Sequence, residues 1–338
     1  MTTATTSAPE SKGTPTAQPA KARRASWGDL ALDNIVWLLL VVFVIIATVL
    51  NPFFLSVANF QNVLVQTTTL GFVSVAIALS MLLGEIDLSV VGTLGFTGAV
   101  GALLMEKGLS GTLAILVVVG LGALIGLING ICIAKLRMTS LIETLAMGLV
   151  LGGGVLALTK GRTITISDTS YTWLGQGQIF GWPTMPIALI ALFLAIGLVL
   201  HRTPWGRKIY ATGGNQRAAY AAGINTDRLI IGTFVLGGFL GGCAGWLATS
   251  YLSGVNSTMG SDLLLYAVAA PVIGGVSLTG GRGRVLGILG GVLLLTVVQV
   301  GLQLTNIDAY YVSIAGGFMI FLAVVVDAIR VRRRQARH

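Results

Sequence analysis

Three carboxylates interrupt apolar sequence at positions where they could handle a polar solute or an ion. Glu85 and Asp87 lie in LLGEIDLSVVG between two apolar runs, and Glu143 lies near the start of LIETLAMGLV. A charge at the centre of a bilayer costs about 2.5 to 3.5 kcal/mol on insertion scales, so such groups usually face a cavity or lie near an interface. We therefore predict that these three residues line a translocation path.

Two amides could serve the same path. Asn129 and Gln299 occupy apolar runs and could hydrogen-bond sugar hydroxyls, although each could equally bridge two helices. Asp87 also has a second interpretation, because D-L-S can cap a helix that begins at Ser89 by placing the carboxylate on unpaired backbone donors. The residue types leave these alternatives open.

The sequence carries no catalytic, nucleotide or metal signature. It lacks G-x-x-x-x-G-K-[ST], so it cannot cradle ATP phosphates by that route. His201 and His338 have no metal-like companion, and the cysteines Cys132 and Cys243 fall inside apolar runs. We expect a chain that is not an enzyme and that binds no metal or cofactor itself.

The composition predicts an all-α polytopic membrane protein. Of 338 residues, 54% are hydrophobic and 10% are charged, whereas soluble proteins have about 25% charged residues. A net charge of +9 could suggest a nucleic-acid partner, but the basic residues lie in short loops and tails instead of on one soluble face. We predict no nucleic-acid partner and a surface that faces membrane lipid.

The apolar runs predict ten transmembrane helices, each close to the roughly 20 residues that cross a bilayer. They are 34–50, 62–83, 89–105, 111–134, 139–159, 185–201, 229–251, 262–278, 285–304 and 309–328. With this topology, 18 of the 21 Lys and Arg residues fall on the side of the two termini, and only Lys107, Lys160 and Arg162 fall on the other. Short loops rich in Lys and Arg stay in the cytoplasm, so both termini are predicted to be cytoplasmic.

The ends of the chain differ from the rest. Residues 1–26 are rich in Thr, Ala, Ser, Pro and Lys and contain no apolar run, which predicts a disordered cytoplasmic tail. The transmembrane domain is expected over 27–328, and 329–338 should be a basic cytoplasmic tail. No small-residue cleavage pattern follows the first span, which predicts an uncleaved anchor.

The loop 202–228 is the longest polar interval with dense positive charge and is predicted to be cytoplasmic. Gly213-Gly214-Asn215 predicts a turn, and Gln216 to Ala222 predicts a short Ala-rich helix closed by Gly223. A compact helix on such a loop suits docking to a protein partner. A solvated connector without a partner is the alternative.

The loop 160–186 is the long external loop of this topology, and it holds aromatic and amide side chains around a Gly-Gln-Gly-Gln turn. Aromatic side chains contribute contact area at low entropic cost, which suits binding of a soluble external protein. The predicted contact residues are Tyr171, Trp173, Gln176 and Trp182. An interfacial aromatic belt without a partner is the alternative.

A partial internal repeat joins LLGEIDLSVVGTLG (82–95) to VIGGVSLTGGRGRVLG (272–287). Each stretch leaves an apolar run, passes through a turn of small residues with L-S or L-T, and enters another apolar run. Duplication would fit a transporter built from repeats around a path near the midplane. Chance similarity, or a re-entrant span, would also explain it.

Five stretches carry a resemblance to a known family. They are GEIDLSVVGTLGFTGAV (84–100), GLINGICIAKL with SLIETLAMG, GQGQIFGWP, GRKIYATGGNQRAAYAAGI (206–224) and AVAAPVIGGVSLTGGRGRVLG (267–287). Together, and in this order, they resemble the membrane-spanning permease subunit of bacterial ATP-binding cassette importers for sugars. The resemblance is to the ribose, xylose and galactose type, within the superfamily of branched-chain amino acid permeases.

The resemblance implies a type II importer-like permease in the bacterial plasma membrane. It would pair with a second copy or a paralogue, with two cytoplasmic ATPases that use ATP and Mg, and with an external sugar-binding protein. It also implies that the loop after the sixth span docks the ATPase. The matching positions are Gly213, Gly214, Asn215, Ala218, Ala219, Gly223 and Ile224.

The chain departs from the family pattern at two acidic residues. Glu85 replaces the usual glycine before I-D-L-S, and Glu143 occupies a site that is usually small or apolar. An extra carboxylate could favour a polyhydroxy or cationic ligand. Amino acid import is the runner-up within this class.

A secondary carrier driven by ions or protons is the alternative from another class, with Glu85, Asp87 and Glu143 as its coupling site. It predicts uptake by the chain alone. A scaffold protein without transport activity explains the polar residues in the spans poorly.

Overall fold

The computed structural model describes residues 35–305 and, beyond them, only residues 311, 314, 317, 318, 321 and 325. The predicted tails 1–26 and 329–338 lie outside the described residues, as does most of the predicted span 309–328.

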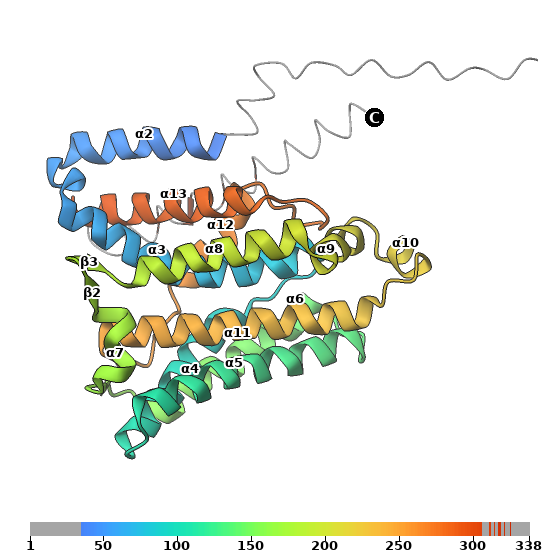
Figure 1. Cartoon of the computed structure of the whole chain (residues 1–338), viewed down its shortest axis with the longest axis horizontal. Helices are drawn as coiled ribbons and strands as arrows, with labels where there is room; N and C mark the ends of the chain where they lie inside the picture. The colour runs from blue at the N-terminus through green and yellow to red at the C-terminus, as the bar shows by residue number, and fades with distance from the viewer. Residues whose placement is uncertain are drawn as a thin grey trace, which may run out of the picture. The chain divides into compact units, whose positions relative to one another are not determined.

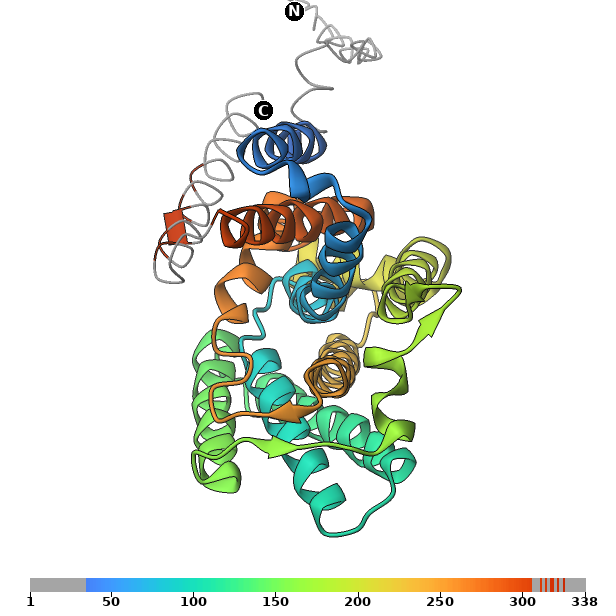
Figure 2. The same cartoon turned by 90° about the vertical axis from the view of Figure 1, so that its left-hand side faces the viewer.

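Long apolar helices that run side by side in alternating directions form the described part of the chain (Figures 1 and 2). Seven of them are long and apolar enough to cross a membrane, so the chain is an all-α multi-pass membrane protein, as predicted. The seven are α3 (Val57–Leu82), α4 (Ser89–Glu106), α5 (Gly111–Ala134), α6 (Ser140–Thr159), α8 (Met185–Arg202), α11 (Thr226–Leu252) and α13 (Val285–Gln303).

Two further apolar helices are shorter, and one of them corrects the sequence prediction. α2 (Ile35–Leu50) has 16 residues and α12 (Leu263–Ile273) has 11. A helix of 11 residues is about 16 Å long, which cannot cross about 30 Å of hydrocarbon, so the full span predicted at 262–278 is wrong. The helix stops because Pro271 is followed by a turn at Gly274 and Gly275, where Gly275 has a φ of 87°.

The segments that join α5 to α6, α8 to α11 and α12 to α13 gather at one end of the helices, which we call the inner end (right in Figure 1). There α3, α5 and α8 end and α11 and α13 begin. Lys135 Nζ lies 3.1 Å from the Asp227 carboxylate, and the Tyr210 hydroxyl donates to the Gly283 carbonyl at 3.1 Å. The predicted grouping of the loops at 135–137, 202–228 and 282–284 on one side is therefore confirmed.

The inner end carries two short helices, α9 (Pro204–Gly214) and α10 (Gln216–Ala221). The predicted short helix is confirmed as α10. The predicted turn at Gly213-Gly214 is wrong, because both glycines form the last turn of α9 and only Asn215 is extended.

The opposite, outer end is closed by short elements. They are η1 (Pro52–Leu55), β1 (Ile164–Thr165), α7 (Thr169–Gln176), β2 (Gln178–Ile179), β3 (Trp182–Pro183) and β4 (Gly254–Val255). β1 pairs antiparallel with β4, and β2 forms a hairpin with β3. Arg162 forms an ion pair with Glu106 at 2.9 Å at this end.

α5 and α11 pack closely in the core, and glycines make the contact. A Cβ atom at Gly122 would overlap the carbonyl of Gly238, and one at Gly126 would overlap the carbonyl of Phe234. Small residues let helix backbones approach closely in a membrane, where packing contacts rather than water drive association. The two helices therefore form one tightly packed unit.

Candidate translocation centre and loop contacts

The segment between α3 and α4 is not helical, and hydroxyl groups of neighbouring helices hold its backbone. Ile86 N–H donates to Ser140 Oγ at 3.2 Å, and Leu88 N–H donates to Thr144 Oγ at 3.1 Å. Asp87 N–H donates to Ser80 Oγ at 3.1 Å. Such bonds are required because irregular backbone inside a membrane protein has no bulk water to satisfy it.

Asp87 is the first polar group of this region, and its side chain is buried. Its Oδ1 accepts from Ser89 N–H at 3.0 Å and from Ser89 Oγ–H at 2.6 Å. The interpretation of Asp87 as a carboxylate that pairs with a backbone donor at the start of α4 is therefore confirmed. Whether it also contacts solute stays a prediction.

Asn129 connects α5 to the same group. Its Nδ2 donates to Ser89 Oγ at 2.7 Å, which confirms that this amide bridges two helices. Asn129 Oδ1 is buried and has no hydrogen-bond partner among the described residues. The Asn129 carboxamide therefore contacts the Asp87–Ser89 pair through Nδ2, while its oxygen accepts no hydrogen bond from the described residues.

Glu143 reaches the region from α6. It is 5% exposed and lies on the same helix face as Ser140 and Thr144, the two residues that hold segment 86–88. Its Oε2 has no partner among the described residues. We call Asp87, Ser89, Asn129 and Glu143 the acceptor centre.

Of the other two predicted path residues, Glu85 lies next to the acceptor centre and Gln299 lies apart from it. Glu85 is half-buried beside Ser140, two residues before Asp87. Gln299 is half-buried on α13, which packs against α12, α2 and α3 rather than against α5 or α6. The predicted path set is therefore not one cluster. Among the described residues no group of three His, Cys, Asp or Glu could hold a metal ion.

The inner loop is built from three successively capped helices. The side chain of Thr203 accepts from Gly206 N–H at 3.3 Å at the start of α9. Asn215 accepts from Ala218 N–H, and Asn225 from Arg228 N–H, both at 3.0 Å, at the starts of α10 and α11. Ser, Thr, Asn and Asp stabilise helix starts in this way by satisfying unpaired backbone donors.

The end of α9 meets both of the stretches that resemble each other in sequence, 82–95 and 272–287. Gly281 N–H donates to the Leu82 carbonyl at 2.9 Å, and a Cβ at Gly213 would overlap that same carbonyl. Gly280, with a φ of 86°, would place a Cβ 2.8 Å from Gly84 N. We call residues 82–84, 213–214 and 280–281 the inner junction. Gly213 therefore attaches the loop to the helices and is not an open contact surface.

The remaining predicted coupling residues divide by exposure. Gly214, Asn215, Ala218 and Gly223 are exposed, Ile224 is half-buried, and Ala219 is buried against the rest of the protein. Tyr220, which the sequence analysis missed, is 72% exposed on α10. The signal that could have identified it is that Tyr220 is the single aromatic residue of the Ala-rich stretch QRAAYAA (216–222).

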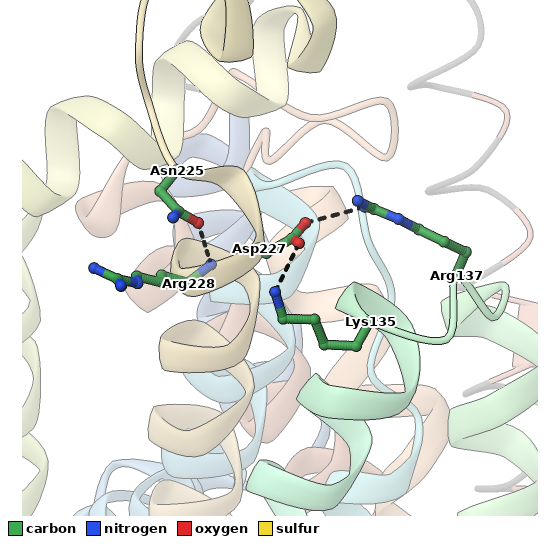
Figure 3. A network of polar contacts seen from close by, with 5 residues as sticks. All are labelled: Lys135, Arg137, Asn225, Asp227 and Arg228. Carbon is green, nitrogen blue, oxygen red and sulfur yellow. Dashed lines mark hydrogen bonds and ion pairs between the residues drawn. The ribbon is translucent and has the colours of Figure 1, made fainter.

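A polar network fixes the start of α11 (Figure 3). Asp227 forms ion pairs with Lys135 and Arg137, each at 3.1 Å. These two residues belong to the turn between α5 and α6. An acidic residue in the first helical turn also interacts favourably with the helix dipole. The network therefore links the inner ends of α5 and α11.

The outer loop is bonded to the other end of α11, which corrects one predicted contact. Tyr171 is fully buried, its hydroxyl lies 2.8 Å from Thr249 Oγ, and its carbonyl accepts from Trp246 Nε1 at 3.0 Å. Tyr171 cannot meet an external protein in this conformation, because its ring fills the core. Gly175 N–H donates to Ser250 Oγ at 2.8 Å.

The exposed part of the outer loop is smaller than predicted and contains one residue that the sequence analysis missed. Trp173 is 60% exposed and Trp182 is 47% exposed. Gln176 is exposed as well, although its amide also bonds to Ser253. Phe180, at the tip of the β2–β3 hairpin, is fully exposed. Its position before Gly181 in a short apolar stretch was the available signal.

Comparison with known proteins gives a consistent result. The family model described as branched-chain amino acid transport system / permease component matches residues 59–324. The ribose import permease of Haemophilus influenzae is 37% identical over 305 residues, which cover 89% of this chain and 94% of that protein. The ribose import permease of Bacillus subtilis is 38% identical over 290 residues, covering 85% of this chain and 90% of that protein.

The L-arabinose transporter permease of Azospirillum brasilense is 36% identical over 318 residues, which are 94% of each chain. These matches extend over the helices that hold the acceptor centre and both loops. The chain therefore belongs to the family of branched-chain amino acid transport system permease components.

Proposed function

We propose that this chain is the permease subunit of an ATP-driven importer in the bacterial plasma membrane and forms the path for a sugar. The observation that carries the proposal is that α11 joins the two loops directly. Its inner end continues into α10 and its outer end holds α7. At 27 residues, it is an unbroken helix of about 40 Å.

The packing of α5 on α11 supports transmission along this helix. Glycine contacts between the backbones and the ion pairs at Asp227 leave little room for the two helices to slide independently. A displacement of the inner loop is therefore passed to the outer end instead of being absorbed between them. The chain itself supplies the path and hydrolyses no ATP.

The partners follow from the two exposed surfaces. A cytoplasmic ATPase, which uses ATP and Mg, docks on α10 through Ala218 and Tyr220. An external sugar-binding protein docks on Trp173, Trp182 and Phe180. A second copy of the chain or a paralogue completes the path. The docked ATPase must contact the inner loop differently in two states, because equal contact would shift no equilibrium.

The proposal of a sugar rests on the relatives and on the acceptor centre. The relatives are named for ribose and L-arabinose import. Buried carboxylate and amide oxygens can accept hydrogen bonds from sugar hydroxyls. A thermal-shift screen of the cognate external binding protein against sugars and branched-chain amino acids separates this proposal from amino acid import.

Substitution of Ala218 by Arg tests the docking role. Ala218 is exposed, so Arg should leave the fold intact, whereas Ala219 is buried and unsuitable. We expect Ala218→Arg to abolish ATP-driven uptake and co-purification of the ATPase. Ser167→Arg, which adds the same charge on an exposed residue of the outer loop, should retain the ATPase. Normal uptake by Ala218→Arg would refute the docking role.

The acceptor centre favours one alternative function, an ion-coupled secondary carrier. Two buried carboxylates could bind a coupling ion or proton. That function predicts uptake by the purified chain without ATP, and an uncoupler would dissipate it.

A further inference from the structure

The acceptor centre contains more hydrogen-bond acceptors than donors. Ser89 donates both its backbone N–H and its hydroxyl proton to Asp87, and Asn129 Nδ2 donates to the Ser89 hydroxyl oxygen. Thr144 donates its hydroxyl proton to the backbone carbonyls of Ile86 and Ser140. Asn129 Oδ1 and Glu143 Oε2 remain buried without a donor among the described residues. Buried acceptors without a donor are costly, so they point to a missing partner.

No cation of the described chain neutralises this group. Each ion pair found among the described residues lies at the inner or outer end, between Asp227 and Lys135 or Arg137, or between Arg162 and Glu106. Neither Asp87 nor Glu143 takes part. Ser89 supplies Asp87 with two donors, whereas Glu143 Oε2 has neither a donor nor a counter-charge among the described residues. A bound proton or a bound partner must therefore complete Glu143.

The position of the centre suits a moving solute. Ser89, Asn129 and Glu143 lie on α4, α5 and α6, and a Cβ at Gly237 of α11 would lie 3.7 Å from Asp87 Oδ2. The Asp87 carboxylate is therefore contacted by α4 and approached by α11, while α5 bonds to Ser89 and α6 bonds to the backbone on either side of Asp87. In the present conformation Asp87 is 2% exposed. Movement of α11 relative to α4 and α6 would open access to it.

We propose that the acceptor centre is a solute-selecting site that favours an ammonium-bearing sugar over a neutral one and a neutral sugar over an anionic one. This inference rests on the proposed function as a solute permease and adds the charge class of the solute. An ammonium group supplies three donors and a positive charge, whereas a hydroxyl supplies one donor. A carboxylate supplies no donor and is repelled by Asp87 and Glu143.

Three hexoses provide matched probes: D-glucosamine, D-glucose and D-glucuronate. Their binding to the purified full chain is measured at constant ionic strength by calorimetry or thermal shift. We expect glucosamine to bind most tightly, with about a tenfold step in Kd for each change of charge, which is the effect of about 1.4 kcal/mol. Equal binding of the three hexoses, or no binding of any, would overturn the proposal.

Two isosteric substitutions locate the effect. Glu143→Gln removes one of the two buried carboxylates and keeps the volume of the side chain, so each step in Kd between the three hexoses should fall well below tenfold. Glu106→Gln makes the same change in the exposed outer ion pair and should keep the wild-type order. Thermal denaturation of each variant confirms that it is folded. Retention of the full charge preference by Glu143→Gln would contradict the proposal.

Sodium chloride provides a competing probe for a simple ion site. At equal concentration it should displace little glucosamine, whereas complete displacement would mean an inorganic cation site and would overturn the proposal. The binding assay contains no ATPase, so its outcome does not depend on whether transport is coupled to ATP hydrolysis. Suppose that the three hexoses bind in the expected order while uptake into vesicles needs no ATP. The proposal of a solute-selecting site would then be supported, and the proposed ATP-driven function would be refuted.

Discussion

The inner and outer loops are attached to opposite ends of the same helix by different kinds of contact. The inner loop is held by glycine backbones at the inner junction and by asparagine and threonine caps. The outer loop is held by side-chain hydrogen bonds from Tyr171 and Ser250, by the backbone pairing of β1 with β4, and by the close approach of Gly175 to the backbone of α11. Both loops therefore combine close backbone contacts with single side-chain bonds. They differ in what they contact, because the inner loop also reaches Leu82 at the end of α3, whereas the outer loop is held by the end of α11 and by β4.

The largest effect is expected where backbones touch between α5 and α11. Gly126→Leu would force a side chain into the carbonyl of Phe234, and overpacking of this kind costs about 1 to 3 kcal/mol or more. We expect a lower thermal unfolding temperature and a low yield of folded protein from membranes.

Gly120→Leu is the matched control for that substitution. Gly120 lies on the same helix, and nothing lies within 4 Å of a Cβ at that position. Its unfolding temperature should remain close to that of the wild type. Equal destabilisation of both variants would show that the contact with α11 does not determine the result.

A smaller effect is expected where side chains hold the outer loop. Tyr171→Phe removes the hydroxyl that bonds to Thr249, and one such bond contributes about 0.5 to 1.5 kcal/mol. The cost should be near the lower value, since the Thr249 hydroxyl also donates to the Gly245 carbonyl at 2.7 Å. Thermal unfolding measures the loss, and Tyr220→Phe on the exposed face of α10 is the control. A loss of several kcal/mol would mean that the outer loop is as rigid as the inner one.

The ion pairs at Asp227 should contribute less still to stability. Lys135 and Arg137 have side chains that are 59% and 67% exposed, and exposed pairs contribute about 0 to 1 kcal/mol. Asp227→Asn should lower the unfolding temperature slightly at low salt. The difference should vanish in about 1 M salt, where the Debye length is about 3 Å. A loss that salt does not change would indicate a role other than ion pairing.

The smallest expected effect is on the stability of the fold at acidic pH. Hydrogen bonds from the Ser170 hydroxyl and the Gly111 N–H hold the pKa of Asp168 below its usual value. Asp168 therefore stabilises the fold above its unfolded pKa of about 3.9, and this contribution is lost as the pH falls through the folded pKa. Asp168→Asn should flatten the decline in unfolding temperature below about pH 4. An unchanged acid profile would exclude this contribution.

The sequence predicted features that depend on local pattern. Long apolar runs identified the spans, and the Asn215 cap with the Ala-rich stretch after it identified α10. The carboxylates were recognised because charge is rare in apolar sequence. Lys and Arg in the loops identified the inner end.

Features that depend on distant partners were missed. The local sequence of Tyr171 is typical of a surface residue. In the fold, its hydroxyl is hydrogen-bonded to Thr249, which lies 78 residues later in the chain. Gly213 has the local propensity of a turn residue, yet it is needed as glycine because α9 approaches Leu82. α12 is shorter than predicted because it ends at the turn that follows Pro271. The apolar sequence continues past this turn, so hydrophobicity alone did not predict where the helix ends. Burial of Glu143 against segment 86–88 likewise requires the fold.

Uptake into sealed vesicles tests the central claim most directly. Vesicles that contain this chain and its ATPase, supplied with the external binding protein, should accumulate sugar only when ATP is present on the ATPase side. Vesicles that contain the chain alone should accumulate none. Accumulation by the chain alone without nucleotide, lost on addition of an uncoupler, would contradict the account.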